Sequence, residues 1–286
     1  MSTPLVIYHA HCLDGYGSAY AAYVHFVLHR QMAVDFHPAM HGDALPEVAG
    51  RIVYLVDFVY KRDTMKRLCE QAEQVIVLDH HVSAMEDLEG LDLECRNLTL
   101  HWDNDRSGAM ITWEYFHNEP APLLIHCIQD RDLWRWDHPE SQALNAGLMS
   151  NPFSFEFWHK VATEPSVFDQ LVVEGNTINR YRNQLIQQHK KIAVLSDVAG
   201  YRVPVVNCPR AIVSELLGEL AEGFPFAAGY VDRGSRRTWS LRSTESGIDV
   251  AELAVRFGGG GHVRAAGFSV DLPESHLHLP MISSQE

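Results

Sequence analysis

The chain has 286 residues, of which 46% are hydrophobic and 21% are charged, and this composition is typical of a globular protein rather than a disordered one. Lysine and arginine total 23 and aspartate and glutamate total 37, so the formal net charge is −14. A protein that binds long nucleic acid usually presents a basic face to the phosphates, so the charge argues against long nucleic acid as a partner.

Short apolar runs alternate with helical patterns through the first half of the chain. Strands are predicted over 5–8, 52–56 and 75–78, and helices over 17–28, 62–72, 107–116 and 122–128. The strand runs are continuously apolar and rich in β-branched residues, which indicates strands buried on both faces. The predicted fold class of this half is therefore α/β with a parallel sheet.

A long helical segment separates this half from a second α/β pattern. No strand is predicted between residues 155 and 195, and 167–194 is expected to form one helix. Beyond it, strands are predicted over 203–206, 226–231, 238–241 and 267–270, and helices over 213–222 and 250–257. The predicted organisation is a first domain over 1–165, a helical linker over 166–197, a smaller α/β domain over 198–272 and a C-terminal tail over 273–286.

Membrane and redox features of the sequence indicate a cytoplasmic protein. No apolar run reaches the roughly 18 residues that a membrane span requires, so no membrane partner is expected. The first residues, MSTP, lack the features of a signal peptide. The five cysteines show no CxxC pair, and an odd number of unpaired thiols is typical of a reducing compartment.

Aspartates follow three predicted strands of the first domain. Asp14 follows the first strand in the segment YHAHCLDG, Asp57 ends the second, and Asp79 ends the third in the segment VLDHH. In open α/β sheets ligands bind beyond the carboxyl ends of the strands, where these carboxylates would converge. Converging carboxylates repel one another unless cations separate them. With His9 and His80 nearby, the nitrogen and oxygen donors suit Mn²⁺ or Zn²⁺.

A fourth apolar run leads to two further acids, Asp130 and Asp132. A single aspartate after a strand is most often a turn former or a helix N-cap, and a lone histidine is usually structural. Several such acids in series, two of them beside histidines, favour a metal site over separate structural roles.

The second domain offers arginines and a glycine run for substrate binding. All its cations after Gly200 are arginines, which suit bidentate phosphate recognition. Arg236 and Arg237 are expected to be solvated, and Arg242, at the end of a strand, is the favoured substrate contact. The run GGGGH exceeds what a helix C-cap requires, so its amides and His262 are expected to contact a phosphate or terminal nucleotide.

The segments VLDHH and FGGGGHVRAAGF, in order after the other two aspartate-bearing segments, resemble the DHH–DHHA1 phosphoesterase superfamily. The resemblance covers about residues 5 to 271. It implies a parallel-sheet DHH domain joined by a helical linker to a smaller α/β DHHA1 domain. It also implies a hydrolase with two Mn²⁺ ions, for which Mg²⁺ or Co²⁺ could substitute.

The resemblance implies roles for individual residues. Asp57 is expected to bridge both metals, His81 to contact the scissile phosphate, and Asp79 to act in catalysis by orienting His80 or one metal. Asp132 is the rival of Asp130 and is expected to support the ligands from outside. The expected metal ligands are His9, Asp14, Asp57, His80, Asp130 and Cys12. The expected substrate ligands are Arg242, Gly259, Gly260, Gly261, His262 and Arg264.

The first segment departs from the common pattern of the superfamily. Many members carry two acids there, whereas here Asp14 matches the last acid and Cys12 stands in the place of the first. Either the first metal site is weakened, or Cys12 or His11 completes it. Gly15 and Gly17 are expected to let the backbone approach the ligand, or to form an ordinary tight turn.

The acidic charge and the small second domain favour a substrate of a few nucleotides. The expected function is a Mn²⁺-dependent phosphodiesterase that cleaves very short ribonucleotides, such as linear pGpG or pApA from cyclic dinucleotide turnover, to mononucleotides. A phosphomonoesterase of the 3′-phosphoadenosine 5′-phosphate type, a RecJ-like exonuclease and a non-catalytic nucleotide sensor stay open as alternatives. Base preference is open, and so is the oligomeric state, including a homodimer.

Overall fold

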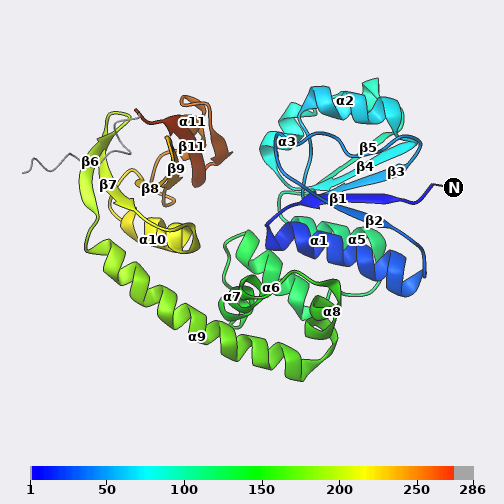
Figure 1. Ribbon diagram of the computed structural model, residues 1–286, viewed down its shortest axis with the longest axis horizontal. Helices are drawn as coiled ribbons and strands as arrows, with labels where there is room; N and C mark the ends of the chain where they lie inside the picture. Colours follow the sequence, from blue (N-terminus) through cyan, green and yellow to red (C-terminus); the bar gives the residue numbers. More distant parts are fainter. Residues whose placement is uncertain (1, 274–286) are drawn as a thin grey trace, which may run out of the picture. The chain divides into compact units, whose positions relative to one another are not determined.

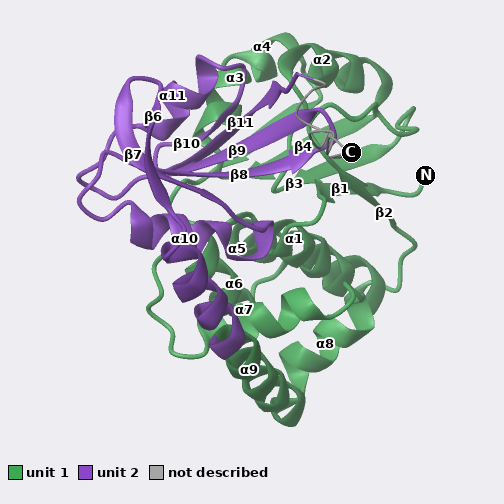
Figure 2. Ribbon diagram, turned by 60° about the vertical axis from the view of Figure 1, so that its left-hand side comes forward, with its two compact units in different colours: residues 1–179 green, residues 180–286 purple. Residues whose placement is uncertain are grey.

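The computed structural model describes residues 2–273 and divides into two compact units, 1–179 and 180–286 (Figure 2). The division falls within the long helix α9 (Pro165–Lys190). The predicted domain bounds at 165, 197 and 272 stay predictions. Except for residue 273, the predicted tail lies outside the described residues. Over residues 2–273, no helix has the combination of length and apolar character that crossing a membrane requires.

Unit 1 is built on a five-stranded parallel sheet with the strand order β2-β1-β3-β4-β5 (Figure 1). Its strands are β1 (Leu5–His9), β2 (Asp35–Ala39), β3 (Ile52–Val56), β4 (Gln74–Asp79) and β5 (Leu98–Trp102). The predicted α/β class and the three predicted strands are confirmed. The sequence did not indicate β2 and β5, because these two edge strands carry polar residues and lack a continuous apolar run.

Alternate residues of the central strands pack into two separate cores. In β1, Leu5 and Ile7 share one core with Met65, whereas Val6 shares the other with Phe26. Helices α1 (Leu13–Tyr23) and α5 (Gly108–Phe116) cover one face of the sheet, and α2 (Arg62–Gln71) and α3 (Val82–Asp87) cover the other (Figure 1). Coverage on both faces explains why these strands are apolar at consecutive positions.

The remaining helices of unit 1 differ from the predictions at their ends. Helix α1 begins at Leu13 rather than at 17 and continues into a π-helix, η1 (Val24–His29). Helix α6 (Leu123–Asp132) extends beyond the predicted end at 128, as far as the second of the two acids. The other helices are α4 (Leu91–Glu94), α7 (Ser141–Ser150) and α8 (Phe155–Thr163).

Unit 2 contains a six-stranded mixed sheet with the order β10-β11-β9-β8-β7-β6. The strands are β6 (Val194–Val198), β7 (Tyr201–Asn207), β8 (Ala227–Arg233), β9 (Arg236–Arg242), β10 (Gly260–His262) and β11 (Ala265–Asp271). The helices are η2 (Arg210–Ile212), α10 (Val213–Leu220) and α11 (Val250–Val255). One core contains Phe226 and Leu253, and a second contains Cys208 and Leu217. Gly260 and Gly261 of the glycine run lie in the short edge strand β10.

Candidate metal centre

The carboxyl ends of β1, β3 and β4 meet at one edge of the parallel sheet. The register pairs Tyr8 with Val56 and Val56 with Leu78, so the residues that follow, His9, Asp57 and Asp79, are neighbours. The backbone amide of Asp57 donates to the carbonyl of Leu78 at 2.9 Å, which fixes the end of β3 against β4. The three strand-end residues therefore converge, as the sequence predicted.

Asp57 is the most unusual residue at this edge. It is 2% exposed, and neither of its carboxylate oxygens has a hydrogen-bond partner among the described residues. Its φ of +54° lies in the left-handed region, which non-glycine residues rarely adopt and which often marks a functional site. Burial alone would raise the pKa of Asp57, but the nearby rings of His80 and His9 lower that pKa below its usual range. The carboxylate is therefore held as a buried anion among histidine rings.

The N-terminus of α5 holds Asp14 beside Asp57. The backbone amides of Gly108 and Ala109 donate to the two carboxylate oxygens of Asp14 at 2.7 and 3.0 Å. A Cβ at Gly108 would lie 2.5 Å from the Cβ of Asp57, so only glycine permits this approach. Helix N-termini stabilise anions. Even so, burial and then repulsion from Asp57 raise the pKa of Asp14 well above its usual range.

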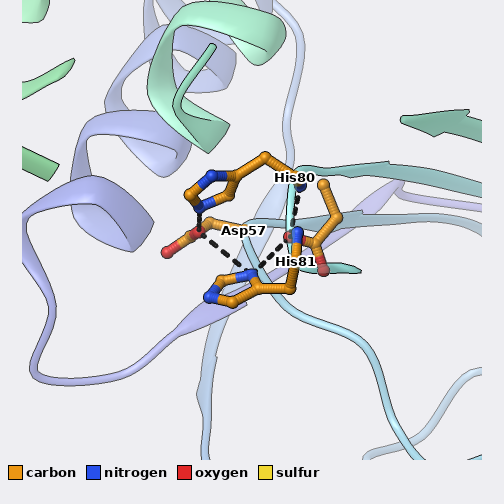
Figure 3. Close-up of side chains that lie close together, drawn as sticks. Asp57, His80 and His81 are labelled. Atoms are coloured by element: carbon orange, nitrogen blue, oxygen red, sulfur yellow. Dashed lines mark hydrogen bonds and ion pairs between the residues drawn. The ribbon is translucent and has the colours of Figure 1, made fainter. Parts of the chain in front are cut away.

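The ring of His80 lies among three carboxylates. Its Nε2 is 3.3 Å from Oδ1 of Asp57, 3.5 Å from Oδ2 of Asp132 and 3.7 Å from Oδ2 of Asp14. Burial alone would lower the pKa of His80, but these acids, Asp57 first, raise it to about 10. Figure 3 shows the rings of His80 and His81 converging on Asp57. Three carboxylates therefore surround one small volume, and a positive charge in that volume would offset their mutual repulsion.

Asp79 organises the two histidines that follow it. Its Oδ1 accepts hydrogen bonds from the amides of His80 at 2.7 Å and His81 at 3.3 Å, and lies 2.7 Å from Nδ1 of His81. Burial alone would lower the pKa of His81, but the bond to Asp79 raises it. Asp79 therefore has the orienting contacts that the sequence analysis expected, and they orient His81 as well as His80.

The structure brings Asp132, and not Asp130, to the cluster. Residues two apart on an α-helix point in nearly opposite directions, and both acids lie on α6. Asp130 accepts hydrogen bonds from the amides of Asp137 at 2.8 Å and His138 at 3.3 Å, which stabilises the turn after α6. The expected position of Asp130 in the cluster is therefore wrong, and Asp132 lies there instead. The sequence analysis ended the helix at residue 128, so it could not tell which of the two acids faces the cluster.

A second group of donors lies around His9. Donor atoms of His9, Cys12 and Asp57 lie within 4.8 Å of one another. Burial, and then the neighbouring Asp57 and Asp14, raise the pKa of the Cys12 thiol well above its usual range. The sequence analysis did not single out His41, whose ring is centred 6.0 Å from that of His9. His41 lies just after β2, and because that edge strand was not predicted, nothing in the sequence placed His41 near the other strand ends.

These donor groups fit divalent metal ions. Asp57 belongs both to the group with His9 and Cys12 and to a group with Asp79, His80 and His81. A third group joins Asp14, His80 and Asp132. Buried carboxylate oxygens without donors, in a mixed set of oxygen and nitrogen ligands, are typical of sites for ions such as Mn²⁺ or Zn²⁺. The shared position of Asp57 is suited to a ligand that contacts two ions.

Unit 2 contains a cavity of about 1010 Å³ on its sheet. Arg242, Gly259 and Gly260, three of the predicted substrate ligands, line it, and so do Arg210, Arg233 and Arg236. The guanidinium of Arg242 donates to Oγ of Ser214 at 2.9 Å. A Cβ at Gly259 would lie 2.1 Å from the carbonyl oxygen of Gly267, so close packing against β11 explains this glycine.

Three other predicted substrate residues, and Arg237, have different surroundings. Arg264 donates through its guanidinium to the carbonyls of Glu245, Gly247 and Ile248, so it stabilises a loop instead of facing the cavity. Gly261 and His262 belong to β10 and are not among the residues that line the cavity. Arg237, expected to be solvated, pairs with Asp232 at 2.7 Å.

Solved structures share the fold of this chain. The chain matches the DHH domain of a protein assigned to a family of ribosomal proteins with a TM-score of 0.63 and 14% identity, over 96% of this chain and 83% of that chain. It matches the pGpG-specific phosphodiesterase PggH from Vibrio cholerae with a TM-score of 0.54 and 14% identity, over 96% of each chain. These likenesses show the fold.

Two curated relatives are similar to the chain in sequence. The uncharacterized protein R106 of Acanthamoeba polyphaga mimivirus is 28% identical over 287 aligned positions, which are 93% of this chain and 67% of the relative. The oligoribonuclease NrnB of Bacillus subtilis is 25% identical over 244 positions, or 76% of this chain and 59% of the relative. No family model matches the chain. The likeness in fold to a DHH domain agrees with the resemblance seen in the sequence.

Proposed function

We propose that the chain is a two-metal phosphodiesterase that hydrolyses very short ribonucleotides, with linear dinucleotides such as pGpG or pApA as its substrates and Mn²⁺ as its metal. The observation that carries this proposal is Asp57, a buried carboxylate without hydrogen-bond donors among the described residues, beside Asp14 and Asp132. A buried charge of this kind is costly unless a cation is bound next to it. Its membership of two donor groups supports a bridging role.

The side chains around Asp57 have distinct proposed tasks. Bound metal ions would supply an activated hydroxide and offset charge on the phosphate oxygens. Asp14, His80 and Asp132 would hold one ion, and His9 would hold the other. His81 would bind the scissile phosphate, because Asp79 holds its Nδ1 and its raised pKa favours a ring that carries a hydrogen on each nitrogen.

The relatives and the charge distribution support a short substrate. NrnB is named an oligoribonuclease, and PggH, which shares the fold, is named a pGpG-specific phosphodiesterase. The net charge of −14 repels a long polyanion, whereas Arg210, Arg233 and Arg242 gather at the cavity of unit 2. Arginines there can bind the few phosphates of a dinucleotide.

A length series tests the proposal. Cleavage of 5′-phosphorylated ribonucleotides from two to ten residues should be measured with Mn²⁺ and after chelation. We expect kcat/KM to be highest for the dinucleotide and to fall steeply by about four or five residues, because each added phosphate meets the acidic surface. Equal or rising efficiency with length would favour the RecJ-like alternative. Cleavage of 3′-phosphoadenosine 5′-phosphate alone would favour the phosphomonoesterase.

A further inference from the structure

Another cluster of side chains that could bind a metal ion lies in unit 1, away from the candidate metal centre. We propose that His29, His117 and Glu119 form a separate Zn²⁺ site. Asp14 and Gly108 belong to the N-terminal ends of α1 and α5, which lie side by side (Figure 1), whereas His29 and His117 follow their C-terminal ends. At a rise of about 1.5 Å per residue, His117 lies roughly 14 Å along α5 from Gly108.

His117 has the surroundings of a metal ligand. It is 8% exposed, and its Nε2 lies 3.0 Å from the carbonyl oxygen of Ala21. Because a carbonyl can only accept, Nε2 carries the hydrogen and the neutral ring has its lone pair on Nδ1. Metal-bound histidines typically donate their other N–H to a carbonyl or carboxylate in this way. The ring of Trp113 stacks on His117 with centroids 4.2 Å apart and holds its orientation.

Glu119 faces the lone pair of His117. Its Oε1 lies 3.8 Å from Nδ1 of His117, and both atoms are acceptors when the ring is neutral, so a cation between them would satisfy both. The burial of His117 lowers its pKa, which favours the neutral ring. The indole of Trp113 donates to the backbone carbonyl of Glu119 at 3.0 Å, so Trp113 contacts both the ring of His117 and the backbone of Glu119.

His29 supplies the third donor from the π-helix η1. Its ring centroid is 5.4 Å from that of His117, and donor atoms of His29, His117 and Glu119 lie within 4.8 Å of one another. His25 lies one turn earlier in η1, with its ring centred 5.8 Å from that of His117 and its Nδ1 3.1 Å from the carbonyl oxygen of Phe116. π-Helical turns are rare and occur often at functional sites.

The donor set selects the ion. Two imidazoles and one carboxylate suit Zn²⁺ with a water as fourth ligand. Zn²⁺ bonds of about 2.0–2.2 Å require donors about 3.3 Å apart in a tetrahedral site. His29 and Glu119 are exposed, so rotation of their side chains can close the remaining distance.

Zn²⁺ titration of the full-length chain, stripped of metal by a chelator, tests the site. His29→Asn and Glu119→Gln each remove one exposed ligand, and His126→Asn, an exposed histidine on α6, is the matched control. We expect the two ligand variants to lose one Zn²⁺ equivalent or to bind it at least about 100-fold more weakly. Loss of a residue that only supports a ligand would weaken binding by about 10–100-fold. Mn²⁺-dependent phosphodiesterase activity should stay unchanged in both.

Co²⁺ absorption gives a readout that does not depend on activity. A tetrahedral Co²⁺ band should appear in the parent chain and in His126→Asn, and should be lost in His29→Asn and Glu119→Gln. Asp57→Asn separates the two centres. The single Asp57→Asn variant should still bind Zn²⁺ at His29, His117 and Glu119, and adding His29→Asn or Glu119→Gln to it should remove that binding. Unchanged Zn²⁺ equivalents and affinity in both ligand variants would overturn the proposal, and so would an equal loss in His126→Asn.

Discussion

Asp57 combines burial, carboxylate oxygens without a hydrogen-bond partner among the described residues, and a left-handed backbone in one residue. Each property costs free energy in the folded chain: a strained φ costs about 1–3 kcal/mol, and a buried charge without donors costs more unless a cation accompanies it. These costs are easier to explain if Asp57 serves as a metal ligand than if it serves to stabilise the fold.

Replacing Asp57 separates these two effects. Asp57→Asn should lower Mn²⁺-dependent kcat/KM by at least about 10³-fold, because the shared ligand of the proposed centre is lost. The same change should also reduce the rise in melting temperature that Mn²⁺ gives the parent chain, because an ion that binds only the folded state stabilises it. Dinucleotide cleavage and thermal melting with and without Mn²⁺ check both effects. Near-normal activity would rule out the two-metal proposal.

The two acids of α6 offer a matched pair. Asp132→Asn should weaken Mn²⁺ binding and lower turnover, because Asp132 lies 3.5 Å from His80 in the cluster. Asp130→Asn should leave Mn²⁺ affinity within about twofold but cost about 1–2 kcal/mol of unfolding free energy, because its carboxylate accepts two backbone amides. Metal titration and urea unfolding of both variants measure the difference. The reverse pattern would restore Asp130 as the ligand.

At the scale of elements, the N-terminus of α5 is part of the centre although it carries no charged side chain there. Its first amides hold Asp14, and Gly108 leaves room for Asp57. A backbone contribution of this kind has no signature in the sequence beyond a serine and a glycine before a helical pattern.

Gly108→Ala tests this contribution. The new methyl group would overlap Asp57, so we expect a loss of Mn²⁺ affinity and of turnover by at least about 100-fold. Gly218→Ala in α10 is the control, because a Cβ there meets nothing within 4 Å. The control should retain activity and gain about 0.5–1 kcal/mol of stability, as expected when alanine replaces a glycine inside a helix. Equal activity in the two variants would contradict the structural argument.

The sequence predicted elements well where burial is continuous and poorly where it is not. Strands β1, β3 and β4 are buried on both faces, so their apolar runs indicated them and placed Asp57 and Asp79 at their ends. The edge strands β2 and β5 were missed, and with β2 the position of His41. The distinction between Asp130 and Asp132 depends on helix phase, which could not be known before the end of α6 was known.

At the scale of the whole molecule, charge is expected to act on the substrate in two opposite ways, repelling it at a distance and attracting it at short range. The net charge of −14 opposes any anion at a distance, whereas arginines at the cavity of unit 2 attract phosphate at short range. Long-range interactions between exposed charges are screened by salt, with a Debye length of about 10 Å at 0.1 M, and short-range contacts are screened less.

Ionic strength should therefore act differently on substrates of different length. Raising the salt concentration should increase kcat/KM for a tetranucleotide relative to a dinucleotide, because repulsion grows with substrate charge and is the interaction that salt screens. Cleavage rates at low substrate concentration, from about 0.02 to 0.5 M salt, give this ratio. A constant ratio would show that the acidic surface does not determine substrate length.

The turn that Asp79 holds together has a kinetic consequence. The three hydrogen bonds of the Asp79 carboxylate reach no further than two residues along the chain, and two backbone amides donate to Asp14. None of these contacts needs an ion, so we expect the proposed ligands to be in position before an ion binds. Metal loading should then need no rearrangement of the chain, and its observed rate should rise linearly with Mn²⁺ concentration in a stopped-flow experiment. A rate that reaches a plateau would instead reveal a slow opening step between the empty protein and the loaded one.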